Sequence, residues 1–151
     1  MDRQRHWLQV LLLIAVFVLF SACQSPAQAV REEGGPEMKA HYVEIVSDSV
    51  DRQIKALEQV HGLSFGPEVQ DLGRARVAET ENGVLVGIRA PLAEHEQPII
   101  RTYFVVDDIA KAVKAAEAAG ALVAYPPTKQ GETGTWAIYM IDGIQYGLWQ
   151  Q

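Results

Sequence analysis

The stretch Thr102–Ala121, T-Y-F-V-V-D-D-I-A-K-A-V-K-A-A-E-A-A-G-A, contains the pattern that decides the fold. Its first residues, Thr102–Val106, are mostly β-branched or aromatic, which is typical of a β-strand. Asp107 and Asp108 then supply acceptor side chains for a helix start. Gly120 is placed to end that helix in a left-handed conformation that other residues resist. The apolar face of the predicted helix consists of Ile109, Val113, Ala116 and Gly120.

The same strand–helix pattern occurs earlier in the chain, at an offset of roughly sixty residues. Val43–Val46 is a short apolar strand, Asp48 and Ser49 can cap a helix, and Gly62 can end it. The apolar face of this helix is predicted from Val50, Ile54, Leu57 and Val60. The strands that close each half also match, with G-V-L-V-G-I at 83–88 and G-I-Q-Y-G-L at 143–148. A repeat seen only twice indicates a duplicated supersecondary unit rather than a solenoid.

Each half has the order β-α-β-β-β. The first half continues with an extended segment at 65–69, a strand at 74–79, a turn at 81–83 and a strand at 84–89. The second half continues with strands at 122–125, 135–141 and 144–149, a loop at 126–134 and a tight turn at Asp142–Gly143. The stretch Pro91–Pro98 reads as the linker between the halves. We therefore predict an α+β fold in which two βαβββ modules, residues 40–90 and 99–151, form a curved, mostly antiparallel sheet with a central cup.

The N-terminus has the features of a targeting segment. Arg3 and Arg5 precede an apolar run to Phe20 that is too short to span a bilayer comfortably. Small residues before Cys23 resemble a bacterial lipobox, which predicts a lipoprotein-type signal peptide at 1–23 and lipidation of Cys23. Cleavage after Ala29, at an A-x-A site, and an uncleaved anchor are the alternatives.

All three interpretations place the domain outside the cytoplasm. We expect a protein of the cell envelope, held at a bacterial membrane by an N-terminal lipid anchor, with a secreted or periplasmic protein as the alternative. Residues 24–38 are polar and contain Pro, Gly and Glu, which predicts a disordered tether before a domain at 39–151.

Composition excludes several classes of function. The net charge is -6 and no basic stripe is visible, so we expect no nucleic acid partner. The single Cys excludes an intramolecular disulfide. The sequence shows neither a Ser-His-Asp or Cys-His arrangement nor a Gly-rich phosphate cradle, so no catalytic residue is assigned.

Three segments resemble the vicinal oxygen chelate superfamily, which includes glyoxalase I, bleomycin-resistance proteins, fosfomycin-resistance enzymes and extradiol dioxygenases. These are Y-F-V-V-D-D-I-A-K-A-V-K-A-A-E-A-A-G-A, the helix end H-G-L-S-F at 61–65, and the closing D-G-I-Q-Y-G-L-W-Q. The resemblance implies the fold given above for nearly all of residues 40–151. Because such proteins often pair or exchange halves, it also makes a homodimer an expectation.

The resemblance further implies where a divalent metal would bind. The ligands are a His or Gln at the start of each half's first strand and a Glu in each half's last strand. Here these positions fall on Tyr42, Arg101, Gly87 and Gly147, none of which is a good ligand. A one-residue slip would supply His41, but it turns the side chain to the other sheet face unless a bulge intervenes. We therefore predict no metal or other cofactor, with a divalent metal only in the alternative interpretation.

Strand parity identifies the residues that face the cup. Trp136 and Tyr139 have opposite parities in one strand, so at most one of them faces inward. Arg and Glu among aromatic rings could bind a flat or anionic small organic ligand by stacking and paired hydrogen bonds. Equally, Glu44 and Arg101 could neutralise each other in an ion pair among core aromatic residues. The candidate ligand-binding residues are Tyr42, Glu44, Arg89, Arg101, Tyr103, Gln145 and Trp149.

Three functions remain open from the sequence. The first is a metal-free binding module of glyoxalase/bleomycin-resistance type that holds a small organic ligand. The second is a metal-dependent enzyme of glyoxalase, isomerase or dioxygenase type, a lyase or dioxygenase, with ligands such as His41 and Glu44. In a metal-free enzyme, Glu44 beside Tyr103 could perform acid–base chemistry. The third is a domain whose role is protein–protein contact.

Overall fold

The computed structural model of the chain describes residues 37–151. The predicted signal peptide, the lipidation site Cys23 and most of the predicted tether lie outside the described residues, so these remain predictions. Within the part that the structure describes, no helix has the length and apolar character needed to cross a membrane.

Both halves of the domain have the predicted β-α-β-β-β order. The first consists of β1 (Ala40–Val46), α2 (Val50–His61), β2 (Glu68–Val69), β3 (Ala75–Glu79) and β4 (Leu85–Arg89), with a 3₁₀ turn at Gln70–Leu72. The second consists of β5 (Ile99–Val105), α3 (Ile109–Ala118), β6 (Leu122–Gln130), β7 (Gly134–Ile141) and β8 (Ile144–Gln150). The Asp108 side chain caps α3 by accepting from the Lys111 backbone N–H, as predicted.

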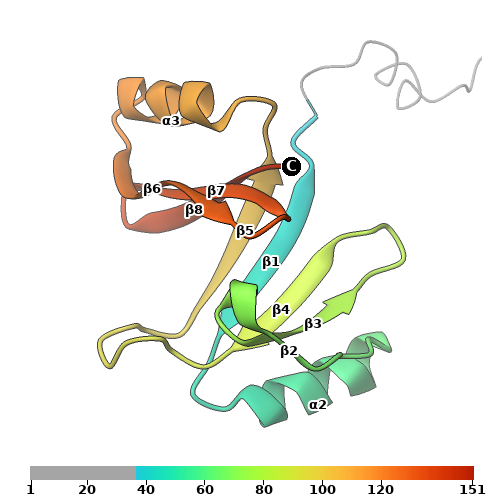
Figure 1. Cartoon of the computed structure of the whole chain (residues 1–151). Helices are drawn as coiled ribbons and strands as arrows, with labels where there is room; N and C mark the ends of the chain where they lie inside the picture. Colours follow the sequence, from blue (N-terminus) through green and yellow to red (C-terminus); the bar gives the residue numbers. More distant parts are fainter. Residues whose placement is uncertain (1–36) are drawn as a thin grey trace, which may run out of the picture. The chain divides into compact units, whose positions relative to one another are not determined.

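The strands form one eight-stranded sheet in the order β2-β3-β4-β1-β5-β8-β7-β6. The β1–β4 and β5–β8 pairs are parallel, and every other neighbouring pair is antiparallel. Figure 1 shows β1 and β5 side by side at the centre, with α2 beside the first module and α3 beside the second. The predicted α+β fold, with two modules and a mostly antiparallel sheet, is confirmed.

The core consists of three apolar clusters. The first lies around α2 and contains Ile54, Phe65, Ala78 and Ile88. The second lies around α3 and contains Ile109, Val113, Ala137 and Leu148. The third joins the two modules on the opposite face of the sheet and contains Tyr42, Tyr103, Ile138 and Trp149. Because side chains alternate along a strand, the helix-facing and cup-facing residues come from the same strands.

Three local predictions were wrong. Ser49 precedes α2, but its side chain makes no capping hydrogen bond. Val60 is 72% exposed, because α2 packs on the sheet through Val50, Ile54 and Leu57, and its last turn extends beyond that contact. Residues 126–130 belong to β6 rather than to a loop. Register shifts on either side of Tyr125 let β6 pass its two prolines, which have no N–H to donate, and resume pairing with β7 at Thr128.

Candidate functional site

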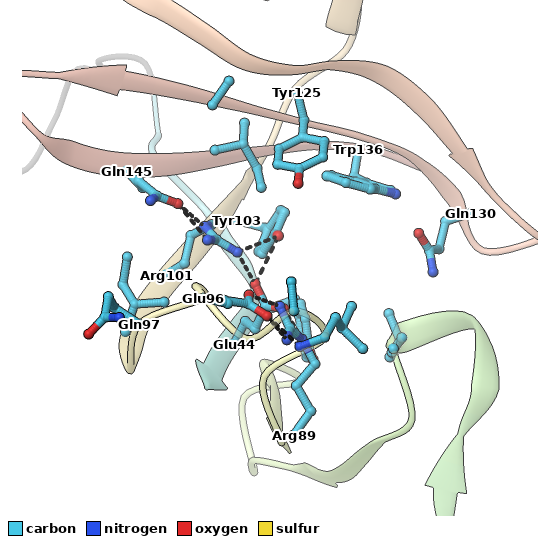
Figure 2. Close-up of a pocket in the computed structure, with 18 of the residues that line it drawn as sticks. Glu44, Arg89, Glu96, Gln97, Arg101, Tyr103, Tyr125, Gln130, Trp136 and Gln145 are labelled. Atoms are coloured by element: carbon cyan, nitrogen blue, oxygen red, sulfur yellow. Dashed lines mark hydrogen bonds and ion pairs between the residues drawn. The ribbon is translucent and has the colours of Figure 1, made fainter. Parts of the chain in front are cut away.

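The cup contains a cavity of about 650 Å³. It lies between the central strands, with the loop at 91–98 and residues 71–73 at its border. All seven residues predicted from strand parity and, for Arg89, from the internal repeat line this cavity: Tyr42, Glu44, Arg89, Arg101, Tyr103, Gln145 and Trp149. Several of them are labelled in Figure 2. Whether they bind a ligand remains a prediction.

Glu44 is the centre of a buried ionic cluster. On β1 it lies directly opposite Arg101 of β5, and it accepts a hydrogen bond from Arg101 Nη1. Its Oε1 accepts from Arg89 Nε at 2.7 Å, and its Oε2 accepts from the Tyr103 hydroxyl at 3.0 Å. Glu44, Arg89 and Arg101 are each no more than 6% exposed. The ion pair between Glu44 and Arg101, which the sequence offered as an alternative to ligand binding, is therefore present, and it extends to Arg89 and links the two modules.

Gln145 completes the cluster on the side of the second module. Its side-chain oxygen accepts from Arg101 Nε at 3.0 Å, so the Arg101 guanidinium lies between Gln145 and Glu44 (Figure 2). Arg101 Nη1 also lies 3.3 Å from the Tyr103 hydroxyl. A planar guanidinium held on two edges has little rotational freedom, so Arg101 is a fixed part of the cup floor.

Burial sets the ionisation of the groups around Glu44. It raises the pKa of Tyr103 and of Tyr42 well above the usual range, and the nearby Glu44 carboxylate raises both further. Burial alone would lower the pKa of Arg89, but its hydrogen bonds to Glu96 and Glu44 outweigh burial and raise it. The cup floor therefore presents neutral tyrosines and a permanently charged Arg89.

Glu96 is a site residue that the sequence did not identify. It lies in the stretch read as a linker, and its carboxylate accepts from Arg89 Nη1 at 2.8 Å and Nη2 at 2.6 Å. The Leu92 backbone N–H also donates to it, at 2.6 Å. The Arg89 hydrogen bonds hold the pKa of Glu96 below its usual range. Residues 91–98 lack the periodicity that predicts where a side chain points, so the only signal was the presence of acidic residues near Arg89.

An aromatic wall faces this cluster across the cavity. Trp136 points into the cup and Tyr139 lies on the other face of β7, where it stacks on Tyr146 with centroids 5.3 Å apart. The ring centroids of Tyr125, on β6, and Trp136 lie 5.6 Å apart. Figure 2 shows both rings on the side of the cavity opposite Arg89. Trp136 Nε1 has no hydrogen-bond partner among the described residues. Tyr125 was not predicted, because the prolines after it obscured the parity of β6.

Solved structures with a similar fold were found, but no protein-family model and no curated protein matches the sequence. Methylmalonyl-CoA epimerase from Mycobacterium tuberculosis superposes with a TM-score of 0.61 at 16% identity, covering 80% of this chain and 93% of that chain. A Streptomyces coelicolor methylmalonyl-CoA epimerase variant in complex with 2-nitronate-propionyl-CoA superposes with a TM-score of 0.53 at 15% identity. The superposition covers 76% of this chain and 97% of that chain. A glyoxalase/bleomycin resistance protein/dioxygenase superfamily member from Vibrio splendidus has a TM-score of 0.55 at 16% identity, over 76% of this chain and 100% of that chain.

The domain has the vicinal oxygen chelate fold. At these identities the likeness extends to the fold alone, so the chemistry of the cup has to be argued from its own residues.

The metal-ligand positions implied by this fold do not fit a divalent cation here. A Cβ added at Gly87 would lie 2.1 Å from the Tyr42 hydroxyl oxygen, and one at Gly147 would lie 2.3 Å from Tyr103 Cδ1. The two tyrosine rings thus occupy the space that Glu side chains would need, which explains the glycines. A third implied position holds Arg101, whose positive charge repels a cation.

His41 does not supply the missing ligand. A bulge between Ala40 and Tyr42 does shift the register of β1, and the His41 ring lies 4.8 Å from the Trp149 ring. However, His41 does not line the cavity, and both oxygens of Glu44 already accept hydrogen bonds from arginines. Among residues 37–151, no group of three or more His, Cys, Asp or Glu side chains is arranged to hold a metal ion.

Proposed function

We propose that this protein is a metal-free binding module of the glyoxalase/bleomycin-resistance type that holds a small organic ligand in the cup. The observation that carries the proposal is the cavity of about 650 Å³, which has an aromatic wall on one side and a fixed charged cluster on the other. A cavity of this size, mostly apolar with a few convergent polar groups, is typical of small-molecule sites.

The bonding of Glu44 favours binding over acid–base catalysis. A carboxylate has about four lone-pair sites, and Glu44 uses three of them for Arg89, Arg101 and Tyr103. A general base has to reach a substrate proton with a free lone pair. At most one lone pair of Glu44 remains, and the three hydrogen bonds fix both carboxylate oxygens in a buried site, which favours the role of a structural anion that positions two guanidinium groups.

The solved structures add one consideration. The Streptomyces coelicolor epimerase variant was solved in complex with 2-nitronate-propionyl-CoA. That complex is consistent with an organic ligand for a protein of this fold. The aromatic pair Trp136 and Tyr125 offers a stacking surface for a flat group of such a ligand.

The test is a thermal-shift screen of the full-length chain against a library of small aromatic and anionic compounds. We expect compounds that raise the melting temperature of the wild-type chain and of Tyr146→Leu, but not of Trp136→Leu. Tyr146 is the matched control because its ring lies on the opposite face of the same hairpin. The proposal is rejected if no compound raises the melting temperature of the wild type, or if the same compounds raise that of Trp136→Leu by as much.

We also propose that the module is anchored in the cell envelope through a lipid on Cys23. Mass spectrometry of the membrane fraction should find the mature chain starting at a diacylated Cys23, and Cys23→Ser should lose that lipid. A mature chain that starts after Ala29 would indicate secretion instead. The homodimer expected from the family resemblance is tested by light scattering of the purified chain.

A further inference from the structure

The loop at 91–98 joins the two modules and also borders the cup. Leu92, His95, Glu96 and Gln97 line the cavity, and most residues of the loop are exposed. Among the described residues, the side-chain hydrogen bonds from this loop to the rest of the domain all join Glu96 to Arg89. Among the polar side-chain contacts of the described residues, the ion pair of Glu96 with Arg89 alone joins the loop to the rest of the domain, and Leu92 adds an apolar contact near Gly73.

Glu96 occupies a preformed receptor for a carboxylate. The Nη1 and Nη2 atoms of Arg89 form a two-pronged edge that binds both oxygens of Glu96, and Glu44 on Nε fixes the direction of that edge. The Arg89 side chain is only 6% exposed, whereas that of Glu96 is 22% exposed. The receptor is therefore the rigid and buried partner, and the carboxylate that fills it comes from the surface loop.

The charge balance of the cup depends on Glu96. With Glu96 in place, two carboxylates face two guanidinium groups, those of Arg89 and Arg101. If the loop moves away, Glu44 alone faces both arginines, and a net positive charge remains in a buried site. Asp71, another acidic residue at the cavity, is exposed. Because an uncompensated buried charge is costly, loss of Glu96 from Arg89 favours the binding of another anion at the same guanidinium group.

There is also room for the loop to move. A second cavity of about 330 Å³ borders the same loop, and all of its lining residues except Asp48 belong to residues 91–98. A mostly exposed segment that borders two cavities and makes few side-chain hydrogen bonds to the rest of the domain can shift without disrupting a packed core.

We propose that residues 91–98 form a lid that Glu96 holds shut, and that the ligand of the cup carries a carboxylate that replaces Glu96 on Arg89. The rest of the ligand then lies against the Trp136 and Tyr125 rings. This inference rests on the proposed function, because it names the class of ligand that the same cup takes.

The lid is tested by measuring the affinity of the full-length chain for benzoate and for its neutral analogue benzamide. Removing the competing carboxylate in Glu96→Ala should tighten benzoate binding about tenfold or more, because the receptor no longer has to be vacated first. Glu94→Ala is the matched control: it removes a carboxylate from the same loop that has no role at Arg89. It should leave benzoate affinity at the wild-type value, and benzamide affinity should be the same in all three chains.

Hydrogen–deuterium exchange supplies a second readout. Benzoate should speed exchange of the wild-type peptide that contains residues 91–98, whereas benzamide should not. The lid proposal is overturned if Glu96→Ala does not bind benzoate, or if it binds benzoate no more tightly than the wild type does. It is also overturned if benzoate leaves the exchange of residues 91–98 unchanged. If library compounds still raise the melting temperature of the wild type but not of Trp136→Leu, the proposed function stands even though the lid proposal fails.

Discussion

The ring of Tyr103 lies over Gly147, so close that a Cβ on Gly147 would be 2.3 Å from Tyr103 Cδ1. In the other module the hydroxyl end of the Tyr42 side chain covers Gly87. Each glycine is thus required by the tyrosine of the neighbouring strand, and both glycines stand at positions that the family resemblance assigns to metal ligands.

We predict that Gly147→Ala and Gly87→Ala each lower the free energy of unfolding by about 1–3 kcal/mol, as expected for overpacking. Urea denaturation monitored by fluorescence measures the change. Gly66→Ala is the control, because its added Cβ would only contact the Val77 carbonyl oxygen at 3.6 Å. Equal stability of Gly147→Ala and Gly66→Ala would show that Tyr103 moves freely.

Glu44→Gln should lower the free energy of unfolding by about 3–5 kcal/mol, because it leaves two buried guanidinium groups without a full negative charge. The exposed pair Glu68–Arg74 gives the comparison: Glu68→Gln should change stability by no more than about 1 kcal/mol. Chemical denaturation of both variants decides this. If Glu44→Gln is as stable as Glu68→Gln, the cluster does not hold the modules together.

The two tyrosines should respond differently to loss of the hydroxyl group. Tyr103 donates to Glu44, so Tyr103→Phe should cost about 1.5–3 kcal/mol. The Tyr42 hydroxyl is buried and has no partner among the described residues, so Tyr42→Phe should be neutral or stabilising. Melting temperatures of the two variants rank them directly, and a larger loss for Tyr42→Phe would contradict the hydrogen bonding described here.

Alkaline pH should destabilise the domain through the same tyrosines. Their pKa values are raised in the folded protein, chiefly by burial, so the folded state binds protons more tightly than the unfolded state. Their contribution to stability is present below the unfolded pKa of about 10 and decreases as the pH rises above it. Urea denaturation across this range should show the decrease. In the double variant Tyr42→Phe/Tyr103→Phe, the free energy of unfolding should decrease less over the same pH range. If it decreases with pH as steeply as in the wild type, the raised pKa values are contradicted.

Much of the fold and of the cup could be predicted because both follow from short-range patterns. The repeat at 43–62 and 102–121 predicted two strand–helix units, and strand parity brought Glu44 and Arg101 to one face. Parity could not predict which nitrogen of each arginine reaches which carboxylate oxygen of Glu44, because that depends on how Arg89 of β4 lies beside β1.

The missed features lie in a loop, at a strand end and in contacts between strands. Glu96 lies in a loop, where neither helical nor strand spacing fixes the direction of a side chain. Tyr125 is the last residue of the strand predicted at 122–125, and the two prolines after it predict a loop, so the pattern is too short to give the direction of its side chain. The tyrosine rings over Gly87 and Gly147 depend on contacts between strands that are distant in sequence.

The cup should bind an organic ligand without a metal. The most direct measurement is the affinity of the full-length chain for a ligand from the library screen, before and after exhaustive treatment with a chelator, together with its metal content. The account predicts the same affinity in both preparations and far less than one divalent ion per chain. Binding that is lost with the chelator and restored by one divalent ion per chain would contradict it.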